Sequence, residues 1–387
     1  MKIALIAPTE IPARRANTIQ VMKMAQAMTE LGHQVRVASP SSLSALDPIS
    51  QSLRTWEKLA HFYGLQTQFP VEWLPARPWL RRYDYGLTAR RWAAQWGADL
   101  VYTRLPQCAA FASRAGMKTI FEVHDLPSGF MFKWLFEQFL TGGGAVRLVT
   151  ISRALAQDLA VRFNIPTQSK FTLTAPDGVD LIRFTELPLP QAARQKLPAD
   201  IRQHLGAFVA GFTGHLYAGR GAELILAMAA RLPEISFLLT GGELGDVERV
   251  KAQAASQNLA NVTLTGFVPN ADLPLFQAAC DVLLMPYQEH VAASSGGNIA
   301  RYLSPMKLFE YMACGRAILS SNLPVLCETL TSETAILLPP ADVGAWVAAL
   351  QELQSNEAKR FSLGEAARRS VEQYSWENRS RKILDGL

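Results

Sequence analysis

Short apolar runs alternate with longer amphipathic stretches along the whole chain. In the first half these runs read IALIAP, QVRVAS, LVYTR, TIFEVHD and RLVTIS, and in the second half FVAGFTG, ISFLLTGG, NVTLTGF, DVLLMPY, RAILSSN and AILLPP. A helical pattern is expected between consecutive runs. Apolar runs of this length that alternate with helices predict parallel strands covered by helices on both faces.

The first helix has recognisable start and stop signals. We expect it to run from about Thr18 to Leu31, with Asn17 as its N-cap and Gly32 as its end. Asparagine is a favoured N-cap, and glycine often follows the last helical turn.

One segment interrupts the alternation. FTELPLPQAARQKLPADI is rich in proline and polar residues, which is typical of an interdomain linker. We therefore expect a Rossmann-like domain over 1–185, a linker over 186–205 and a second Rossmann-like domain over 206–370. The terminal segment 371–387 is expected to form a helix that packs back on the first domain. Ligands of such doubly wound α/β sheets bind at the carboxyl ends of the strands, so the expected site is a central cleft between the domains.

Composition and charge narrow the class of protein. The chain has 387 residues, of which 49% are hydrophobic and 18% charged, and none of its apolar runs could span a bilayer. MKIALIAPTEIPARR is too short in its apolar part for a signal peptide and reads as a buried strand. The four cysteines lack CxxC spacing, which favours buried thiols in a reducing, cytoplasmic compartment over disulfides or a zinc site.

The positive charge is concentrated in the first half. Residues 1–190 hold 21 Lys/Arg and 14 Asp/Glu, a net charge of +7, whereas the whole chain has +5. This half should favour an anionic surface or substrate. Nucleic acid is not an expected partner, because the charge is modest and no recognition motif is present.

The stretch SPMKLFEYMACG, residues 304–315, places a lysine where a helix disfavours it. Ser304 is a suitable N-cap and Pro305 a suitable first helical residue, so Lys307 would be the third. A cation there opposes the helix dipole unless an anion binds the free N–H groups. Glu310, one turn later, could accept hydrogen bonds from a ribose. A capped core helix with a snorkelling lysine explains the motif equally well.

Glycine-rich turns favour the anion-binding interpretation. GFTGHLYAGRGAEL and LLTGGELGD each follow a predicted strand and precede a helix, with Arg220 at one helix start, and SSGGNIARY lies just before Ser304. A single such loop is often only a tight turn. Several at the carboxyl ends of strands in one domain indicate a phosphorylated ligand.

The order of these segments and their residues resemble those of glycosyltransferase family 4. The resemblance extends from MKIALIAP and ANTIQVMKMAQAMTELGHQVRV through VHD, VTISRAL and APDGVD to GFVPNADLPLFQAACDVLLMPY, SPMKLFEYMACGRAIL and YSWENRS. It implies the GT-B fold of two Rossmann-like domains. It also implies a retaining, sugar-nucleotide-dependent reaction with no metal or other cofactor.

The resemblance also implies residue roles. The catalytic set would be His124, Arg220, Lys307 and Glu310. The donor would bind to Gly214, His215, Arg220, Gly241, Gly242, Phe267, Val268, Ser304, Pro305, Met306, Lys307 and Glu310. Glu310 matches the second family glutamate, which binds ribose. Two departures are His215, where the family has an arginine, and Tyr302, where it has the sugar-binding glutamate.

The acceptor is expected to bind the N-terminal domain. His124 and Asp125 end a predicted strand, and His124 would contact the sugar or acceptor, while Asp125 could orient it or cap the next helix. Arg14, Arg15 and Asn17 stand where the family often has a glycine pair, and the arginines suit an anionic acceptor or a diphosphate. A strand-end turn for His124 and a solvated loop for the arginines are the alternatives.

Residues 73–96, WLPARPWLRRYDYGLTARRWAAQW, interleave five arginines with four tryptophans and two tyrosines. This composition suits an anionic membrane surface at the inner face of the membrane, which would fit a lipid-linked acceptor. It also suits single-stranded nucleic acid. An amphipathic helix docked on the sheet by its tryptophans, with a solvated arginine face, is the structural alternative.

We therefore expect a glycosyltransferase that moves a sugar from a nucleoside diphosphate sugar to a glycan or lipid-linked hydroxyl, in bacterial cell-surface polysaccharide or glycolipid synthesis. A sugar-nucleotide epimerase of the same fold would need paired carboxylates, which the sequence does not place. A non-catalytic sugar-nucleotide-binding protein is the other alternative, because of His215 and Tyr302.

Overall fold

The structure, a computed structural model, describes residues 1–42, 52–167, 169–292 and 297–387. Its contacts divide the chain into two compact units. The first unit consists of Met1–Asp177 together with Trp376–Leu387, and the second of Gly178–Ser375. Both are α/β units built on parallel sheets, as the alternation predicted.

The first unit has a seven-stranded parallel sheet with the order β3-β2-β1-β4-β5-β6-β7. Its strands are β1 (Lys2–Ile6), β2 (Gln34–Ser42), β3 (Val71–Ala76), β4 (Leu100–Thr103), β5 (Thr119–Val123), β6 (Ala145–Thr150) and β7 (Thr172–Thr174). The five strands predicted for this half are all present. The sequence interpretation missed β3 and β7, which form the two edges of the sheet.

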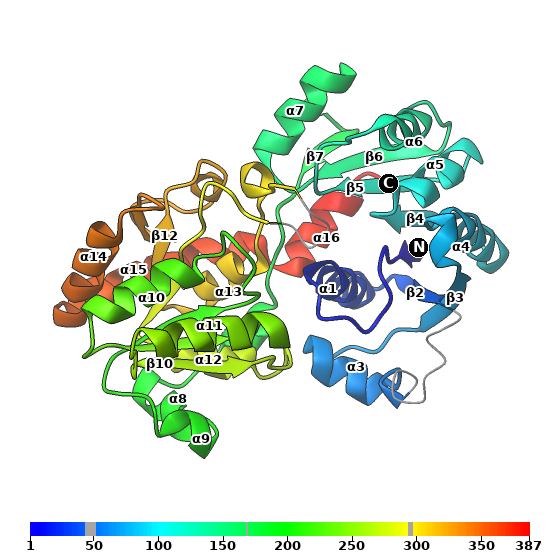
Figure 1. The fold of residues 1–387 in the computed structure, drawn as a ribbon. Helices are drawn as coiled ribbons and strands as arrows, with labels where there is room; N and C mark the ends of the chain where they lie inside the picture. The colour runs from blue at the N-terminus through cyan, green and yellow to red at the C-terminus, as the bar shows by residue number, and fades with distance from the viewer. Residues whose placement is uncertain (43–51, 168, 293–296) are drawn as a thin grey trace. The chain divides into compact units, whose positions relative to one another are not determined.

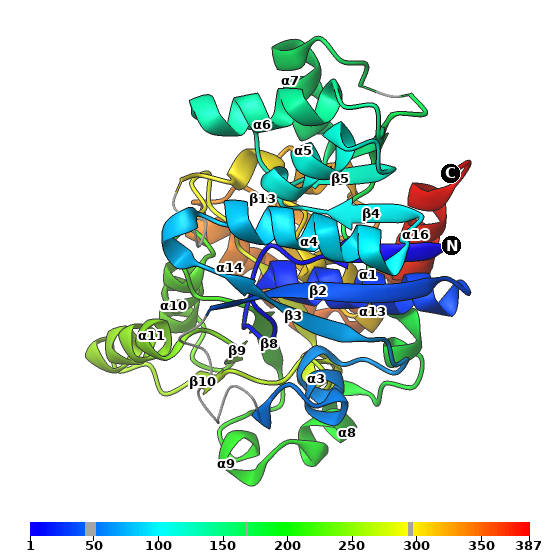
Figure 2. The same cartoon turned by 90° about the vertical axis from the view of Figure 1, so that its right-hand side faces the viewer.

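Helices cover both faces of this sheet (Figures 1 and 2). They are α1 (Ala16–Glu30), α3 (Trp56–Tyr63), α4 (Tyr83–Trp96), α5 (Pro106–Arg114), α6 (Phe130–Leu140), α7 (Arg153–Phe163) and α16 (Trp376–Leu384), with the 3₁₀ turn η1 (Pro78–Leu80). Tyr85 and Ala89 of α4 and Cys108 of α5 pack with strand residues in one core cluster. The terminal helix α16 packs beside α1 in the first unit, whereas residues 371–375 of the expected terminal segment belong to the second unit.

The second unit has a six-stranded parallel sheet with the order β10-β9-β8-β11-β12-β13. These strands are β8 (Val209–Thr213), β9 (Ser236–Thr240), β10 (Val262–Gly266), β11 (Val282–Met285), β12 (Ala317–Ser321) and β13 (Ile336–Leu338). All six coincide with predicted runs. In both sheets the strand order reverses beside the first strand, between β1 and β4 and between β8 and β11, and such switch points are where α/β sheets bind ligands.

The helices of the second unit also cover both faces of its sheet. They are α8 (Pro190–Lys196), α9 (Ala199–Arg202), α10 (Ala222–Arg231), α11 (Leu244–Ser256), α12 (Leu273–Ala278), α13 (Met306–Cys314), α14 (Val343–Ser355) and α15 (Glu357–Ser370), with 3₁₀ turns η2 (Leu181–Phe184), η3 (Ala300–Tyr302), η4 (Leu326–Glu328) and η5 (Val371–Tyr374). One core cluster joins α12 and α13 to the sheet, and a second joins α10, α11 and α14 to it.

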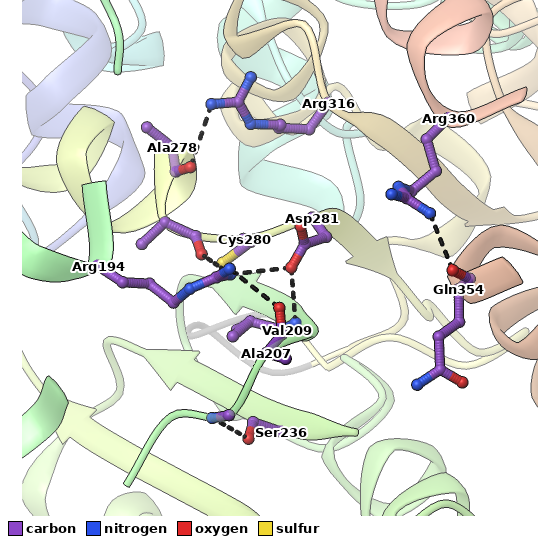
Figure 3. Close-up of polar contacts among 12 residues, drawn as sticks. Arg194, Ala207, Val209, Ser236, Ala278, Cys280, Asp281, Arg316, Gln354 and Arg360 are labelled. Carbon is purple, nitrogen blue, oxygen red and sulfur yellow. Dashed lines mark hydrogen bonds and ion pairs between the residues drawn. The ribbon is translucent and has the colours of Figure 1, made fainter. Parts of the chain in front are cut away.

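The segment 186–205 differs from the expected linker, because it is an integral part of the second unit. Arg194 of α8 donates to the carbonyl oxygens of Ala279 and Ala207, both at 3.0 Å, and to Asp281 at 2.9 Å (Figure 3). Ala193 and Leu197 are buried in the core beside α12. The units divide instead at Asp177/Gly178 and again at Ser375/Trp376. Proline and polar residues there mark short helices, not a free connector.

The first helix begins earlier than predicted, and Asn17 is not its N-cap. Helix α1 starts at Ala16, with Arg15 in the capping position. The hydroxyl of Thr18 donates to the carbonyl oxygens of Ala13 and Arg15 and so closes the turn, while Asn17 Nδ2 donates to Thr9 Oγ1 at 2.8 Å.

Residues 73–96 form the end of β3, the turn η1 and helix α4, so they are not one amphipathic helix. The Trp73 Nε1–H donates to the Ile11 carbonyl at 2.7 Å, and the Trp92 Nε1–H donates to Glu72 at 2.9 Å. Trp96 stacks on Trp92. Three of the four tryptophans therefore dock structural elements, and only Trp79, 70% exposed, stands in solvent. Among the described helices, none combines the length and apolarity needed to cross a bilayer.

Candidate functional site

Helix α13 begins one residue later than the sequence suggested. Pro305, with φ −77° and ψ 124°, occupies the capping position in place of Ser304, and Met306 is the first helical residue. The Leu308 N–H donates to the Pro305 carbonyl at 2.9 Å and closes the first turn. Lys307 is thus the second helical residue, still in the turn where a cation opposes the dipole.

The side chain of Lys307 is buried and has no ion-pair partner in the part of the chain that the structure describes. It is 8% exposed, and its Nζ has no hydrogen-bond partner within the described ranges. The Nζ lies 3.7 Å from the centroid of the Phe212 ring and 5.1 Å from that of Tyr287. Burial lowers the pKa of Lys307 well below its ordinary value, the charge of Arg220 lowers it further, and Glu310 opposes both. An uncompensated buried ammonium is unfavourable, so this position is suited to receive an anion.

A second cation, Arg220, faces the Tyr287 ring. The Arg220 Cζ lies 5.9 Å from the centroid of Tyr287, which is fully buried, and 5.6 Å from that of Tyr217. Its Nε also lacks a hydrogen-bond partner among the residues described. Arg220 precedes α10 on the loop after β8, and Tyr287 follows β11. The two cations therefore lie at the switch point of the second sheet, at the carboxyl ends of its strands.

The glycine loops are bonded to one another beside Lys307. The Gly214 N–H donates to the Thr240 carbonyl, and the Gly241 N–H donates to the Gly266 carbonyl, both at 2.8 Å. A Cβ at Gly214 would lie 3.3 Å from Lys307 Nζ, and one at Gly241 would lie 2.6 Å from the Gly214 carbonyl oxygen. Only glycine permits this approach, with positive φ at both positions. The lysine head thus lies against backbone that a side chain would cover.

Glu310 is held in place by a glutamine on the neighbouring helix. Its Oε2 accepts from Gln277 Nε2 at 2.9 Å, and the same Nε2 lies 3.4 Å from Thr213 Oγ1, the residue before Gly214. The Thr213 N–H in turn donates to Tyr311 OH at 2.7 Å. These bonds join the second turn of α13 to the carboxyl end of β8, so Glu310 and Lys307 belong to one site.

The other expected donor residues lie around this centre. Phe267 and Val268 directly follow Gly266, and Val268 packs on the core. The His215 ring stacks on Tyr217 with 4.7 Å between centroids, and Gly242 approaches Leu216 and Val247. Tyr302, which replaces the family glutamate, is buried in η3. The part of SSGGNIARY at residues 294–296 lies outside the described residues.

In the first unit His124 is bound to a buried glutamate. His124 Nε2 lies 2.5 Å from Glu122 Oε1, and both residues are at the carboxyl end of β5. The Glu122 side chain is fully buried, whereas that of His124 is 20% exposed. Burial and the charge of Arg104 lower the pKa of His124 to about 4, although Glu122 acts in the opposite direction. The imidazole is therefore neutral at physiological pH.

The remaining expected acceptor residues are Asp125, which follows His124, and three residues between β1 and the first turn of α1. Asp125 Oδ1 accepts from the N–H of Leu126 at 2.8 Å, so it does not cap α6, which begins only at Phe130. Burial raises the pKa of Asp125. Arg14 and Arg15 are exposed in the loop that follows β1. Their acceptor roles stay predictions.

Sequence reasoning missed the neighbours of Lys307, Arg220 and Glu310, and the partner of His124. Phe212, Tyr287 and Gln277 come from three separate predicted elements, and only the folded sheet brings them together. Glu122 had a usable signal, because it is the one charge inside the apolar run TIFEV. Alternate strand residues share a face, so Glu122 and His124 were a predictable pair.

A buried aspartate lies in the same polar cluster. Burial and the charge of Glu122 raise the pKa of Asp177 to about 7, against the opposing effects of Arg379, Arg104 and Gln20. Asp177 is therefore protonated in the folded protein at pH values where the unfolded chain has ionised it. The contribution of Asp177 to the free energy of unfolding is therefore complete below about pH 4 and is lost as the pH rises to 7.

We expect Asp177→Asn to raise the melting temperature more at pH 8 than at pH 5. The free-energy gain at pH 8 should be at most about 4 kcal/mol, since one pKa unit corresponds to about 1.4 kcal/mol. Thermal denaturation at both pH values checks it. Asp200→Asn, at an exposed site on α9, is the control. Equal shifts at both pH values would contradict the assignment.

Two family models match the chain, one over most of each unit. The model described as "Glycosyltransferase Family 4" matches residues 18–182, and the one described as "Glycosyl transferases group 1" matches residues 207–356. The chain belongs to the family 4 glycosyltransferases. This glycosyltransferase is 22% identical over 99% of its length to a phosphatidyl-myo-inositol mannosyltransferase of Mycolicibacterium smegmatis, of which the match covers 92%.

A second curated relative matches only in part. The glycosyltransferase is 27% identical over 54% of its length to a D-inositol 3-phosphate glycosyltransferase of Corynebacterium urealyticum, and this match spans about half of that relative, 49%.

Solved structures agree on the fold. Sucrose-phosphate synthase from Thermosynechococcus elongatus superimposes with a TM-score of 0.70 at 18% identity, covering 99% of this chain and 97% of that one. HepE from Anabaena, solved in complex with UDP, superimposes with a TM-score of 0.73 at 15% identity, covering 100% and 99%. The two parallel-sheet units of the glycosyltransferase thus have the GT-B fold.

Proposed function

We propose that this enzyme transfers a sugar from a nucleoside diphosphate sugar to a hydroxyl of a glycan or lipid-linked acceptor, with retention at the anomeric carbon. The observation that carries the proposal is the buried Lys307, which has no ion-pair partner among the described residues, together with the half-buried Arg220, beside the glycine loops of the second unit. A diphosphate would supply the missing negative charge.

The same pair suits the chemistry of the leaving group. During transfer, negative charge develops on the departing diphosphate, and fixed cations at that position stabilise the transition state more than the ground state. Glu310, whose orientation is fixed by Gln277, would accept the ribose hydroxyls. In the first unit, neutral His124 would contact the sugar or acceptor. The proposal assigns no metal to the reaction.

The relatives suggest the class of acceptor. Two of them are named for transfer to inositol phosphate or phosphatidylinositol, which join a polyol to phosphate. We therefore place this enzyme in the synthesis of a bacterial cell-surface glycolipid or polysaccharide, with an acceptor that carries phosphate or a lipid.

A donor panel tests the function. The protein is incubated with UDP-, GDP- and dTDP-sugars in EDTA, and slow donor hydrolysis and transfer to lipid extracts are measured. We expect hydrolysis of one donor class, undiminished by EDTA. A product that remains a sugar nucleotide would instead indicate an epimerase, and binding without turnover would indicate a non-catalytic binding protein.

We also propose that the enzyme binds peripherally to an anionic membrane surface. Apolar side chains are exposed on η1, which follows β3, and at the start of α6, which follows β5: Trp79, Leu80, Phe130, Met131 and Trp134. Carboxyl ends of parallel strands share one edge of a sheet. Arg81, Arg82 and Lys133 accompany these side chains and would bind anionic headgroups.

We expect the protein to float with anionic liposomes at low salt and to dissociate at high salt. The variants Trp79→Ala and Phe130→Ala should each lower the partition coefficient about tenfold, because each loses the burial of an aromatic side chain. Phe361→Ala removes an equally exposed ring from the second unit and serves as control. Failure to float, or equal effects of all three variants, would contradict the membrane assignment.

A further inference from the structure

A fully buried carboxylate lies in the middle of the first sheet. Glu122 belongs to β5, all of whose residues are buried, and its side chain has no exposed surface. A charged group in such a place is strongly destabilising unless several donors surround it. The identity and origin of those donors therefore indicate what the carboxylate is for.

Four donors reach Glu122, three from other helices and strands and one from the residue that follows β5. Oε1 accepts from Gln20 Nε2 of α1, lies 2.5 Å from His124 Nε2 and lies 3.0 Å from Arg379 Nη2 of α16. Oε2 accepts from the hydroxyl of Tyr102 on β4. Arg104 is connected to Glu122 through Gln20, because the Arg104 Nη1 donates to Gln20 Oε1 at 2.9 Å.

Arg379 is the charge that balances this carboxylate. Its side chain is 3% exposed, its Nε donates to the Pro176 carbonyl at 2.7 Å, and its Nη2 donates to the Ala175 carbonyl at 3.0 Å. The guanidinium is thus fixed on the backbone just before the boundary of the unit. Although burial acts to raise the pKa of Glu122, Arg379 and the bond from His124 hold it well below the usual range.

An ionised Glu122 determines the tautomer of His124. A carboxylate can only accept, so the proton of the neutral imidazole must be on Nε2. Nδ1 then carries the lone pair. No hydrogen bond to Nδ1 is found among the described residues, and the ring is partly exposed, so this nitrogen can accept a bond from a hydroxyl.

We propose that Glu122 and Arg379 are positioning residues, through which the C-terminal helix α16 holds His124 with its Nδ1 lone pair presented to a hydroxyl of the sugar or acceptor. This inference rests on the proposed function, because it takes His124 as a group that contacts the reactants. It adds that the contact made by His124 depends on Arg379, which lies 255 positions further along the chain.

The first test is a double-mutant cycle between Glu122 and His124. Glu122→Gln removes the charge and adds an NH₂ donor, so the fixed tautomer is lost. We expect kcat to fall about tenfold to 100-fold, with little change in the KM of the donor, which is held by the other unit. In a His124→Ala background the same change should cost less than about twofold. An equal loss in both backgrounds would overturn the proposal.

The second test reads the tautomer directly. Imidazole ¹⁵N chemical shifts of labelled protein should show the Nε2–H form of His124 in the wild type from pH 6 to 8. They should show mixed tautomers in Glu122→Gln. This measurement does not require turnover, so it still decides the inference if no donor is transferred, whereas the donor panel alone decides the function. A wild type with mixed tautomers, or a variant with an unchanged spectrum, would overturn it.

The role of the charge on Arg379 is tested with a double variant that removes the charges of both Glu122 and Arg379. Arg379→Met alone leaves Glu122 without its cation and is expected to unfold at a lower temperature. The double variant Glu122→Gln/Arg379→Met removes both charges, so it should recover stability but keep the reduced kcat. Arg381→Met is the matched control on the same helix, because Arg381 is exposed and pairs with Glu377. Recovery of kcat together with stability would reduce the pair to a structural role and refute the proposal.

Discussion

Replacing Lys307 with methionine is expected to lower kcat for sugar transfer about 100- to 1,000-fold, the usual loss when one group that stabilises developing charge is removed. Methionine keeps the apolar stem against Phe212 but removes the ammonium. Because that ammonium is buried with no ion-pair partner among the described residues, the variant should melt at a higher temperature than the wild type. Lower activity with higher stability is a combination that general damage to the fold cannot produce.

Steady-state kinetics, thermal denaturation and nucleotide titrations check this expectation. The control is Lys251→Met, since Lys251 is an exposed lysine of α11 paired with Glu248. A variant that melts earlier and retains transfer would mean that Lys307 only packs.

The pH dependence of nucleotide binding follows from the same lysine. Its pKa is lowered in the free protein and should rise when a diphosphate lies beside it. Between those two values, binding takes up a proton, so affinity falls as pH rises through the lowered pKa. Calorimetric binding enthalpies should depend on the ionisation enthalpy of the buffer in the wild type and should lose that dependence in Lys307→Met.

Glu310→Gln is expected to raise the KM of the donor about tenfold to 100-fold, the range for a lost hydrogen bond to a charged acceptor. The amide keeps one oxygen for Gln277 but gives up an acceptor for the ribose hydroxyls. The effect should appear in binding more than in kcat, since the ribose contact is the same in the ground and transition states.

Deoxyribose donors separate this role from a structural one. The wild type should discriminate against a 2′-deoxy or 3′-deoxy nucleotide, and Glu310→Gln should lose most of that discrimination. Glu223→Gln, on the exposed face of α10, is the control. An equal loss for ribose and deoxyribose donors would show that Glu310 only supports the helix.

The strands and the order of the units were predictable, because each central strand is a continuous apolar run. The edge strands were not. β3 contains Pro75 and Trp73, and among the described strands it pairs only with β2, so its pattern resembles a loop with aromatic residues. The segment around Arg194 looked like a linker because its burial depends on acceptors 85 and 87 positions away.

The site was predictable in its charges and not in its contacts. Lys307 and Glu310 stood out because their charges do not fit an amphipathic core helix. Their surroundings, Phe212, Tyr287 and Gln277, come from β8, β11 and α12, which the topology alone brings together. Ser304 failed as a cap for a local reason. Pro305 is already extended, so the helix begins one residue further on.

The return of α16 to the first unit has a consequence for biosynthesis. All seven strands of that unit are translated before the second unit, whereas Arg379 is translated after it. Until then the nascent sheet holds Glu122 without its cation. Completion of the first unit therefore has to wait until the second unit has been translated, and a fragment that stops at Asp177 is expected to remain incompletely folded. The second unit is continuous from Gly178 to Ser375, so all of its residues are translated in one stretch.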